Sequence, residues 1–101
     1  MEILKGILSE SRDYYLKIKS KIEERLASLP QGSIKKRVIA GNAYYYLQRR
    51  INQKVRHKYL GKEKPDDLSA QLKERARLKS ELKKVMGSLK ILRRAGGRKH
   101  D

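Results

Sequence analysis

The chain has 101 residues, of which 38% are hydrophobic and 38% charged, and it contains no Phe, Trp or Cys. This length predicts one small domain with a modest core, and the absence of cysteine excludes disulfides and thiolate metal sites. The formal net charge of +16 favours attraction to nucleic acid or another polyanion. Since no segment has the length and hydropathy of a membrane span or the pattern of a signal peptide, we expect a cytoplasmic protein without membrane contacts, nucleoid-associated if its partner is DNA.

A long helix is predicted over residues 2–29. Its face is marked by side chains that recur at alternating steps of four and three residues, namely Leu4, Leu8, Ser11, Tyr15, Ile18, Ile22, Arg25 and Leu29. Pro30 and Gly32 predict the end of the helix, because proline lacks the N–H that the helix needs and glycine accepts the backbone geometry of a C-terminal cap.

The middle of the chain carries most of the charge and has the pattern of three strands, at 33–40, 43–51 and about 54–60. Residues 33–64 contain ten Lys and Arg and a single acid, Glu63. Gly41-Asn42 between two β-patterned segments is a hairpin signal, which would place Ile39 opposite Tyr44. We therefore expect a three-stranded antiparallel sheet.

The second turn decides which side chains of the third strand share a face with the second. A two-residue loop at Asn52-Gln53 would place Arg50 opposite Val55 and mix polar and apolar residues. A three-residue loop, residues 52–54, places Ile51 opposite Val55 and keeps the apolar residues together, which is how register is usually set. We predict the three-residue loop.

With that register, one face of the sheet gathers the candidate nucleic-acid-binding residues Lys35, Arg37, Tyr44, Tyr46, Gln48, Arg50, Arg56 and Lys58, with Lys54 at the loop. The other face, which is expected to pack on the neighbouring helix ends because a bare three-stranded sheet is barely stable, holds Ile34, Val38, Tyr45, Leu47, Val55 and Tyr59.

A second long helix is predicted over residues 65–95, with Pro65, Asp66 and Asp67 at its start. Its apolar positions follow the rhythm of a coiled-coil seam, at Leu78, Leu82, Val85, Leu89 and Leu92. Gly87 interrupts this helix at a cost of about 1 kcal/mol. We expect an α+β fold over residues 1–95, in which the two helices pair as an antiparallel coiled coil within one chain or between two chains of a homodimer, and a flexible basic tail over 96–101.

The expected function is non-enzymatic binding of nucleic acid. Lys and Arg neutralise phosphates, so five or six such contacts would give a slope of log K against log salt of roughly −5; Arg and Gln can read base edges, and Tyr can stack on bases. Double-stranded DNA is the first choice and RNA the variant. The alternatives are a basic face that is merely solvated, and a protein-interaction module of the phage or mobile-element type, an inhibitor or antitoxin for instance, that grips an acidic protein or a nucleoprotein.

Neither a metal site nor a cofactor is expected. His57 and His100 are isolated and have no cysteine beside them, which does not make a metal site, and Asp66-Asp67 fits a helix start better than a pair of catalytic carboxylates. No catalytic residues are expected either, since no base accompanies the serines of the first helix.

The pattern LP-x-GS, YYYLQ and KYLGK, at Leu29–Ser33, Tyr44–Gln48 and Lys58–Lys62, resembles a group of small uncharacterised prokaryotic basic proteins. The order of three strands followed by a helix also resembles the arm-binding domains of tyrosine recombinases and the plant AP2 domain. That second resemblance, at the level of fold, implies that the sheet is presented to the major groove of DNA.

Overall fold

The structure, a computed structural model, describes residues 2–97. Its elements are α1 (Glu2–Ser28), β1 (Ser33–Ile39), β2 (Asn42–Ile51), β3 (Lys54–Gly61) and α2 (Asp66–Gly97). This confirms the predicted α+β fold, with element bounds within about two residues of those expected. The predicted tail begins inside α2, since Gly96 and Gly97 are helical, and residues 98–101 lie outside the described part of the chain.

The chain forms two compact units, with a boundary inside α2 between Ala76 and Arg77. The helical unit combines α1 with α2 from Arg77 onwards, and the sheet unit extends from Leu29 to Ala76. Over the residues described, neither helix has a stretch that is both long and apolar enough to cross a bilayer.

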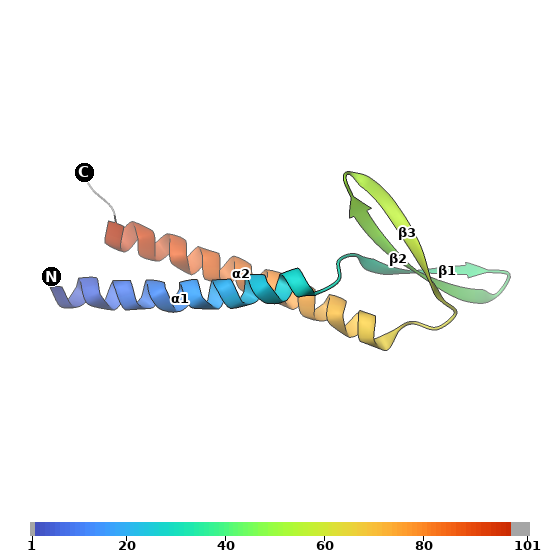
Figure 1. Cartoon of the computed structure of the whole chain (residues 1–101), viewed down its shortest axis with the longest axis horizontal. Coiled ribbons are helices and arrows are strands. Elements are labelled where there is room, and N and C mark those ends of the chain that lie inside the picture. The colour runs from blue at the N-terminus through green and yellow to red at the C-terminus, as the bar shows by residue number, and fades with distance from the viewer. Residues whose placement is uncertain (1, 98–101) are drawn as a thin grey trace. The chain divides into compact units, whose positions relative to one another are not determined.

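In the helical unit, α1 and α2 run in opposite directions (Figure 1). The predicted face of α2 is confirmed as its less exposed side, since Val85 is buried and Leu78, Leu82, Leu89 and Leu92 are half-buried. In α1, Ile22 is buried and Leu26, at the edge of the predicted stripe, is half-buried, but Leu4 and Arg25 of that stripe are exposed. Coiled-coil packing of the two helices, and pairing between chains, remain predictions.

The sheet has the order β1-β2-β3 and is antiparallel throughout. Its first turn is Ala40-Gly41, not Gly41-Asn42, because Ile39 pairs with Asn42. Both turn residues have positive φ, 52° and 80°, as a type I′ turn requires. The pairing of Ile39 with Tyr44 was therefore wrong by two residues, a shift that keeps every side chain on its predicted face because side chains alternate with a period of two.

The second turn departs from the prediction in a way that does change the faces. Arg50 lies opposite Val55 and Ile51 opposite Lys54, so the loop is the two-residue Asn52-Gln53. Both of its residues have positive φ, 50° and 66°, again as in a type I′ turn, whose twist matches that of the flanking strands. The predicted three-residue loop was wrong, and every side chain of β3 up to Tyr59 lies on the face opposite to the one expected.

The linker between α1 and β1 lies close against β2. Leu29 in the linker and Leu47 in the middle of β2 are the buried apolar residues of the sheet unit. A Cβ atom on Gly32 would lie 2.6 Å from the carbonyl oxygen of Gln48 and 3.0 Å from Cδ1 of Leu47. This contact holds the middle of β2, at Leu47 and Gln48, against the linker.

Candidate nucleic-acid interface

One face of the sheet carries a cluster of aromatic rings, because cross-strand partners share a face. Tyr46 lies opposite Lys35 on β1 and opposite Tyr59 on β3. We call this the tyrosine face; its side chains, by alternation from these pairs, include Lys35, Arg37, Tyr44, Tyr46, Gln48, Arg50, Val55, His57 and Tyr59.

The rings of the tyrosine face are already engaged with one another. The Tyr59 ring centroid lies 5.4 Å from that of Tyr46 and 6.4 Å from that of Tyr44, with tilted planes. The Arg37 guanidinium lies 5.5 Å from the centroid of the Tyr46 ring, a cation–π arrangement. These contacts use ring surface that would otherwise be open to a base, and only Tyr59, 53% exposed, is more than half accessible.

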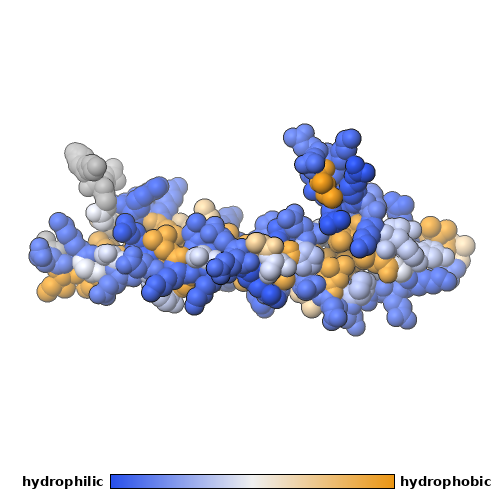
Figure 2. Space-filling view, viewed as in Figure 1, coloured by the Kyte–Doolittle hydropathy of each residue, from blue (hydrophilic) through white to orange (hydrophobic). Residues whose placement is uncertain are grey.

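The opposite face of the β2–β3 hairpin carries the densest charge of the sheet. It holds four exposed cations, which we call the hairpin cations: Arg49, Lys54, Arg56 and Lys58. Arg49 lies directly opposite Arg56, and Lys58 lies opposite Leu47. The hairpin projects from the rest of the sheet (Figure 1), and its surface is mainly hydrophilic in the view of Figure 2.

No carboxylate balances this charge within the sheet. Residues 33–61 contain no Asp or Glu, and in the part of the chain that the structure describes no ion pair reaches a sheet cation. Two arginines held directly opposite each other repel and destabilise the free hairpin. An arrangement of this kind is suited to a ligand that carries several negative charges.

The structure therefore divides the predicted site between the two faces. Six of the nine predicted residues share the tyrosine face, as expected: Lys35, Arg37, Tyr44, Tyr46, Gln48 and Arg50. The prediction that Arg56 and Lys58 join them was wrong, because the two-residue turn places both on the face of Leu47 and Arg49. Lys54 lies on that second face too, as the first residue of β3 rather than within the loop.

The prediction from sequence missed Arg49 and Tyr59, each of which lies at the centre of one face. Tyr59 was assigned to the apolar side and Arg49 to neither. The signal that would have found them was Asn52-Gln53, since a two-residue loop that begins with Asn is typical of a type I′ hairpin. The correct register follows if the preference for a two-residue type I′ turn is given priority over the separation of polar from apolar side chains.

Among residues 2–97, no three His, Asp or Glu side chains are grouped so as to hold a metal ion. The polar side chains of the sheet include its cations, its tyrosines, the imidazole of His57 and the amides of Asn42 and Gln48.

Comparisons with known proteins identify a protein family but give no individual relative and no function. A protein-family model described as a domain of unknown function (DUF6788) matches residues 12–70, which include the sheet and parts of both helices. Neither the curated proteins nor the solved structures contain a significant match. The likeness to arm-binding and AP2 domains therefore stays a prediction.

Proposed function

The chain belongs to the family described as a domain of unknown function, DUF6788, and we propose that it is a non-enzymatic nucleic-acid-binding protein. Double-stranded DNA is the proposed ligand, and the hairpin cations are its main contacts. The observation that carries this proposal is the opposed pair Arg49–Arg56, flanked by Lys54 and Lys58 in a sheet without carboxylates.

Phosphate groups would supply the negative charge that residues 33–61, which contain no Asp or Glu, do not provide. Along β3, the side chains of Lys54, Arg56 and Lys58 recur on one face every second residue, about 6.6 Å apart at 3.3 Å per residue. A row of cations at this spacing can follow a sugar–phosphate backbone and release its condensed counterions. Affinity would then depend on charge and salt far more than on base sequence.

The tyrosine face supports duplex DNA over single strands. Base stacking needs an open ring, whereas Tyr44, Tyr46 and Tyr59 pack on one another and Arg37 covers Tyr46. We therefore expect duplex DNA to compete better than single-stranded DNA for the protein. Stronger competition by single strands would redirect the proposal to RNA or single-stranded ligands read by Tyr59.

The direct test replaces Arg49, Arg56 and Lys58 together by Gln. Binding to a duplex oligonucleotide should weaken at least tenfold near 0.1 M salt, and the slope of log K against log salt should become shallower by about 0.9 for each phosphate that the variant no longer neutralises. The matched control replaces three exposed helical lysines, Lys17, Lys79 and Lys83, and removes the same charge.

Loss of affinity in the hairpin variant alone supports a site on the hairpin, provided that circular dichroism shows an unchanged fold. Equal loss in both variants would mean that the net charge of the chain, rather than any face of the sheet, attracts DNA, and the proposed interface would be rejected.

A further inference from the structure

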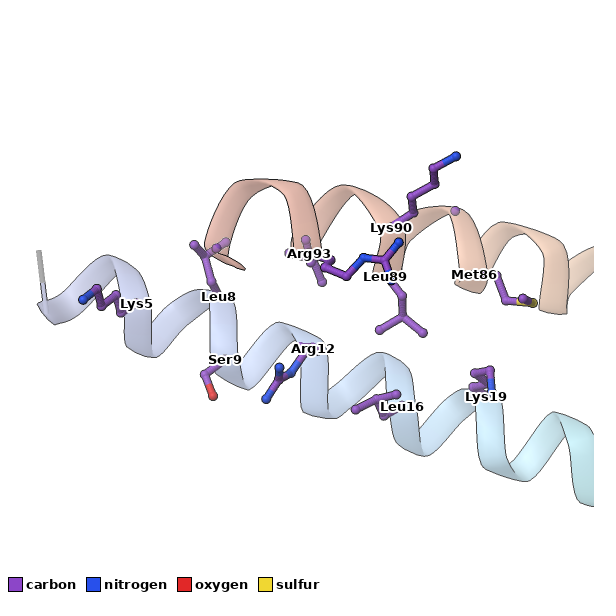
Figure 3. Close-up of a pocket in the computed structure, with 13 residues that line it drawn as sticks. Lys5, Leu8, Ser9, Arg12, Leu16, Lys19, Met86, Leu89, Lys90 and Arg93 are labelled. Carbon is purple, nitrogen blue, oxygen red and sulfur yellow. The ribbon is translucent and has the colours of Figure 1, made fainter. Parts of the chain in front are cut away.

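The helical unit contains a groove that the nucleic-acid interface does not use. It lies between the N-terminal half of α1 and the C-terminal end of α2, has a volume of about 1000 Å³, and is lined only by residues of the helical unit. Leu8 extends from α1 toward α2, and Leu89 extends from α2 toward α1, at different points along the groove (Figure 3). The apolar lining consists of Leu8, Leu16, Met86, Leu89 and Leu92.

This apolar lining is incompletely covered. Leu16 is 45% exposed and Met86 51% exposed, although Ile22 and Val85 elsewhere in the same unit are buried. Exposed apolar surface gathered in a concave site is a mark of ligand or protein binding.

The charged lining of the groove has a single sign. Five cations and no carboxylate line it: Lys5, Arg12, Lys19, Lys90 and Arg93. Lys19 also pairs with Glu23 at 3.2 Å, and Lys90 extends away from the apolar floor in Figure 3. The groove therefore combines an apolar floor with a basic rim.

Gly87 lies beside open space in the wall of the groove. It lines the groove within α2, and a Cβ built on it would meet no atom within 4 Å. Glycine is a poor helix former, and no close approach of another part of the chain requires it here. The space beside Gly87 is where an occupant can come nearest to the backbone of α2.

We propose that this groove binds an amphipathic helix with acidic flanks, supplied by a different protein. Apolar side chains at helical spacing would cover the leucines, and Glu or Asp on both sides would meet the basic rim, the helix-in-groove mode of recognition. A second copy of this chain is disfavoured, because two facing grooves would oppose ten cations. This surface is independent of the nucleic-acid interface and adds a protein partner to it.

The groove sets the length of the occupant. From Lys5 to Lys19, α1 advances roughly 21 Å at 1.5 Å per residue. A helix of about four turns fills this length, with apolar anchors in an i, i+3 or i+4, i+7, i+11 pattern.

The experiment uses labelled 18-residue peptides and fluorescence anisotropy with the full chain. One peptide has Leu at the anchor positions and Glu on both flanks, a second has Lys in place of Glu, and a third has the composition of the first in an order without amphipathicity. We expect the first to bind at least tenfold more tightly than the other two.

Variants then locate the site. Gly87→Trp should fill the groove and weaken binding of the Glu peptide at least tenfold, whereas Gly87→Ala should leave it unchanged. Lys90→Glu with Arg93→Glu, at two exposed positions, lowers the net charge of the rim from +5 to +1 and should reduce the preference for the Glu peptide over the Lys peptide at least fivefold. This reduction carries the test on its own if the Trp variant does not fold.

Three results would overturn the proposal. The first is equal binding of the three peptides. The second is displacement of the Glu peptide by duplex DNA, or its loss on Arg49→Gln, Arg56→Gln and Lys58→Gln, since the sheet would then be its site. The third is a dimer of the wild-type chain in light scattering that Gly87→Trp dissociates, since the occupant would then be a second copy.

Discussion

Among the glycines of the sheet unit, Gly32 is the one at which an added Cβ atom would clash with neighbouring atoms. Its φ of 118° lies in a region that glycine adopts readily and other residues do not. A Cβ there would approach the carbonyl oxygen of Gln48 at 2.6 Å and Cγ of Arg49 at 2.7 Å. The backbone oxygen cannot move aside without disturbing β2, so glycine is required for the linker to lie against that strand.

We predict that Gly32→Ala lowers the free energy of unfolding by roughly 2 kcal/mol or more, through backbone strain and the displacement of β2. Urea unfolding followed by tyrosine fluorescence measures this change. Gly6→Ala is the matched control, because a Cβ on Gly6 meets nothing within 4 Å and alanine should stabilise α1 by about 1 kcal/mol. A neutral Gly32→Ala would contradict the close packing of the linker.

Ala40 has a left-handed backbone conformation without being glycine. Its φ of 52° is one that a residue with a Cβ adopts only at a cost in free energy. The left-handed conformation costs an L-residue roughly 1–2 kcal/mol, and Asn relieves part of this at the first position of a type I′ turn. We predict that Ala40→Asn raises the melting temperature, with a gain of about 0.5–1 kcal/mol. Ala70→Asn, at an exposed position of α2, should instead lower the melting temperature, with a loss of stability of about 0.7 kcal/mol.

At the scale of the element, the register of β3 depended on a competition between turn geometry and polarity. Separating polar from apolar side chains favoured the three-residue loop, and the preference of a twisted hairpin for a type I′ turn favoured two residues. Polarity carried little weight here because this end of the hairpin buries no side chain on either face. The packing of Tyr59 on Tyr44 and Tyr46 adds aromatic contacts that only the two-residue loop allows.

A double-mutant cycle distinguishes the two registers. Tyr46→Ala and Tyr59→Ala should couple by about 1 kcal/mol, as packed aromatic pairs do. Tyr45→Ala and Tyr59→Ala should not couple, because Tyr45 lies on the other face. Under the three-residue loop the result would be the opposite, since Tyr45 and Tyr59 would share a face.

The Arg49–Arg56 pair predicts a conflict between stability and binding. Arg49→Gln should stabilise the free protein by about 0.5 kcal/mol at low salt, because it removes repulsion between opposed like charges, and less at high salt, where charges are screened. The same change should weaken DNA binding. Thermal melts at two salt concentrations, with Arg50→Gln opposite Val55 as control, measure the first effect; a destabilised Arg49→Gln would contradict it.

At the scale of the whole molecule, the two compact units have separate buried residues. Ile22 and Val85 belong to the helical unit, and Leu29 and Leu47 to the sheet unit. Each unit is small, so the loss of one buried side chain removes a large part of its apolar core. The helix α2 contributes to both units, which gives them a continuous backbone connection but no shared buried residue among these four.

We predict that Val85→Ala destabilises the helical unit selectively, by roughly 2 kcal/mol. Hydrogen exchange should show reduced protection in α1 and in α2 beyond Ala76, while the amides of the β2–β3 hairpin keep their wild-type protection. Val38→Ala, at a position 64% exposed, is the control and should change neither unit appreciably. A uniform decrease over both units would show that they unfold as one.

The sequence by itself determined the element order, the bounds of the helices and strands, the apolar stripe of α2 and the concentration of cations in the sheet. These depend on local propensity and periodicity, which neighbouring residues set. The tertiary structure decided which face each β3 side chain occupies, how far Gly32 approaches β2, and that the helices leave a groove beside Gly87. These depend on turn twist and on contacts between segments distant in the chain, where a two-residue and a three-residue loop differ by little in local preference but exchange the two faces of a strand.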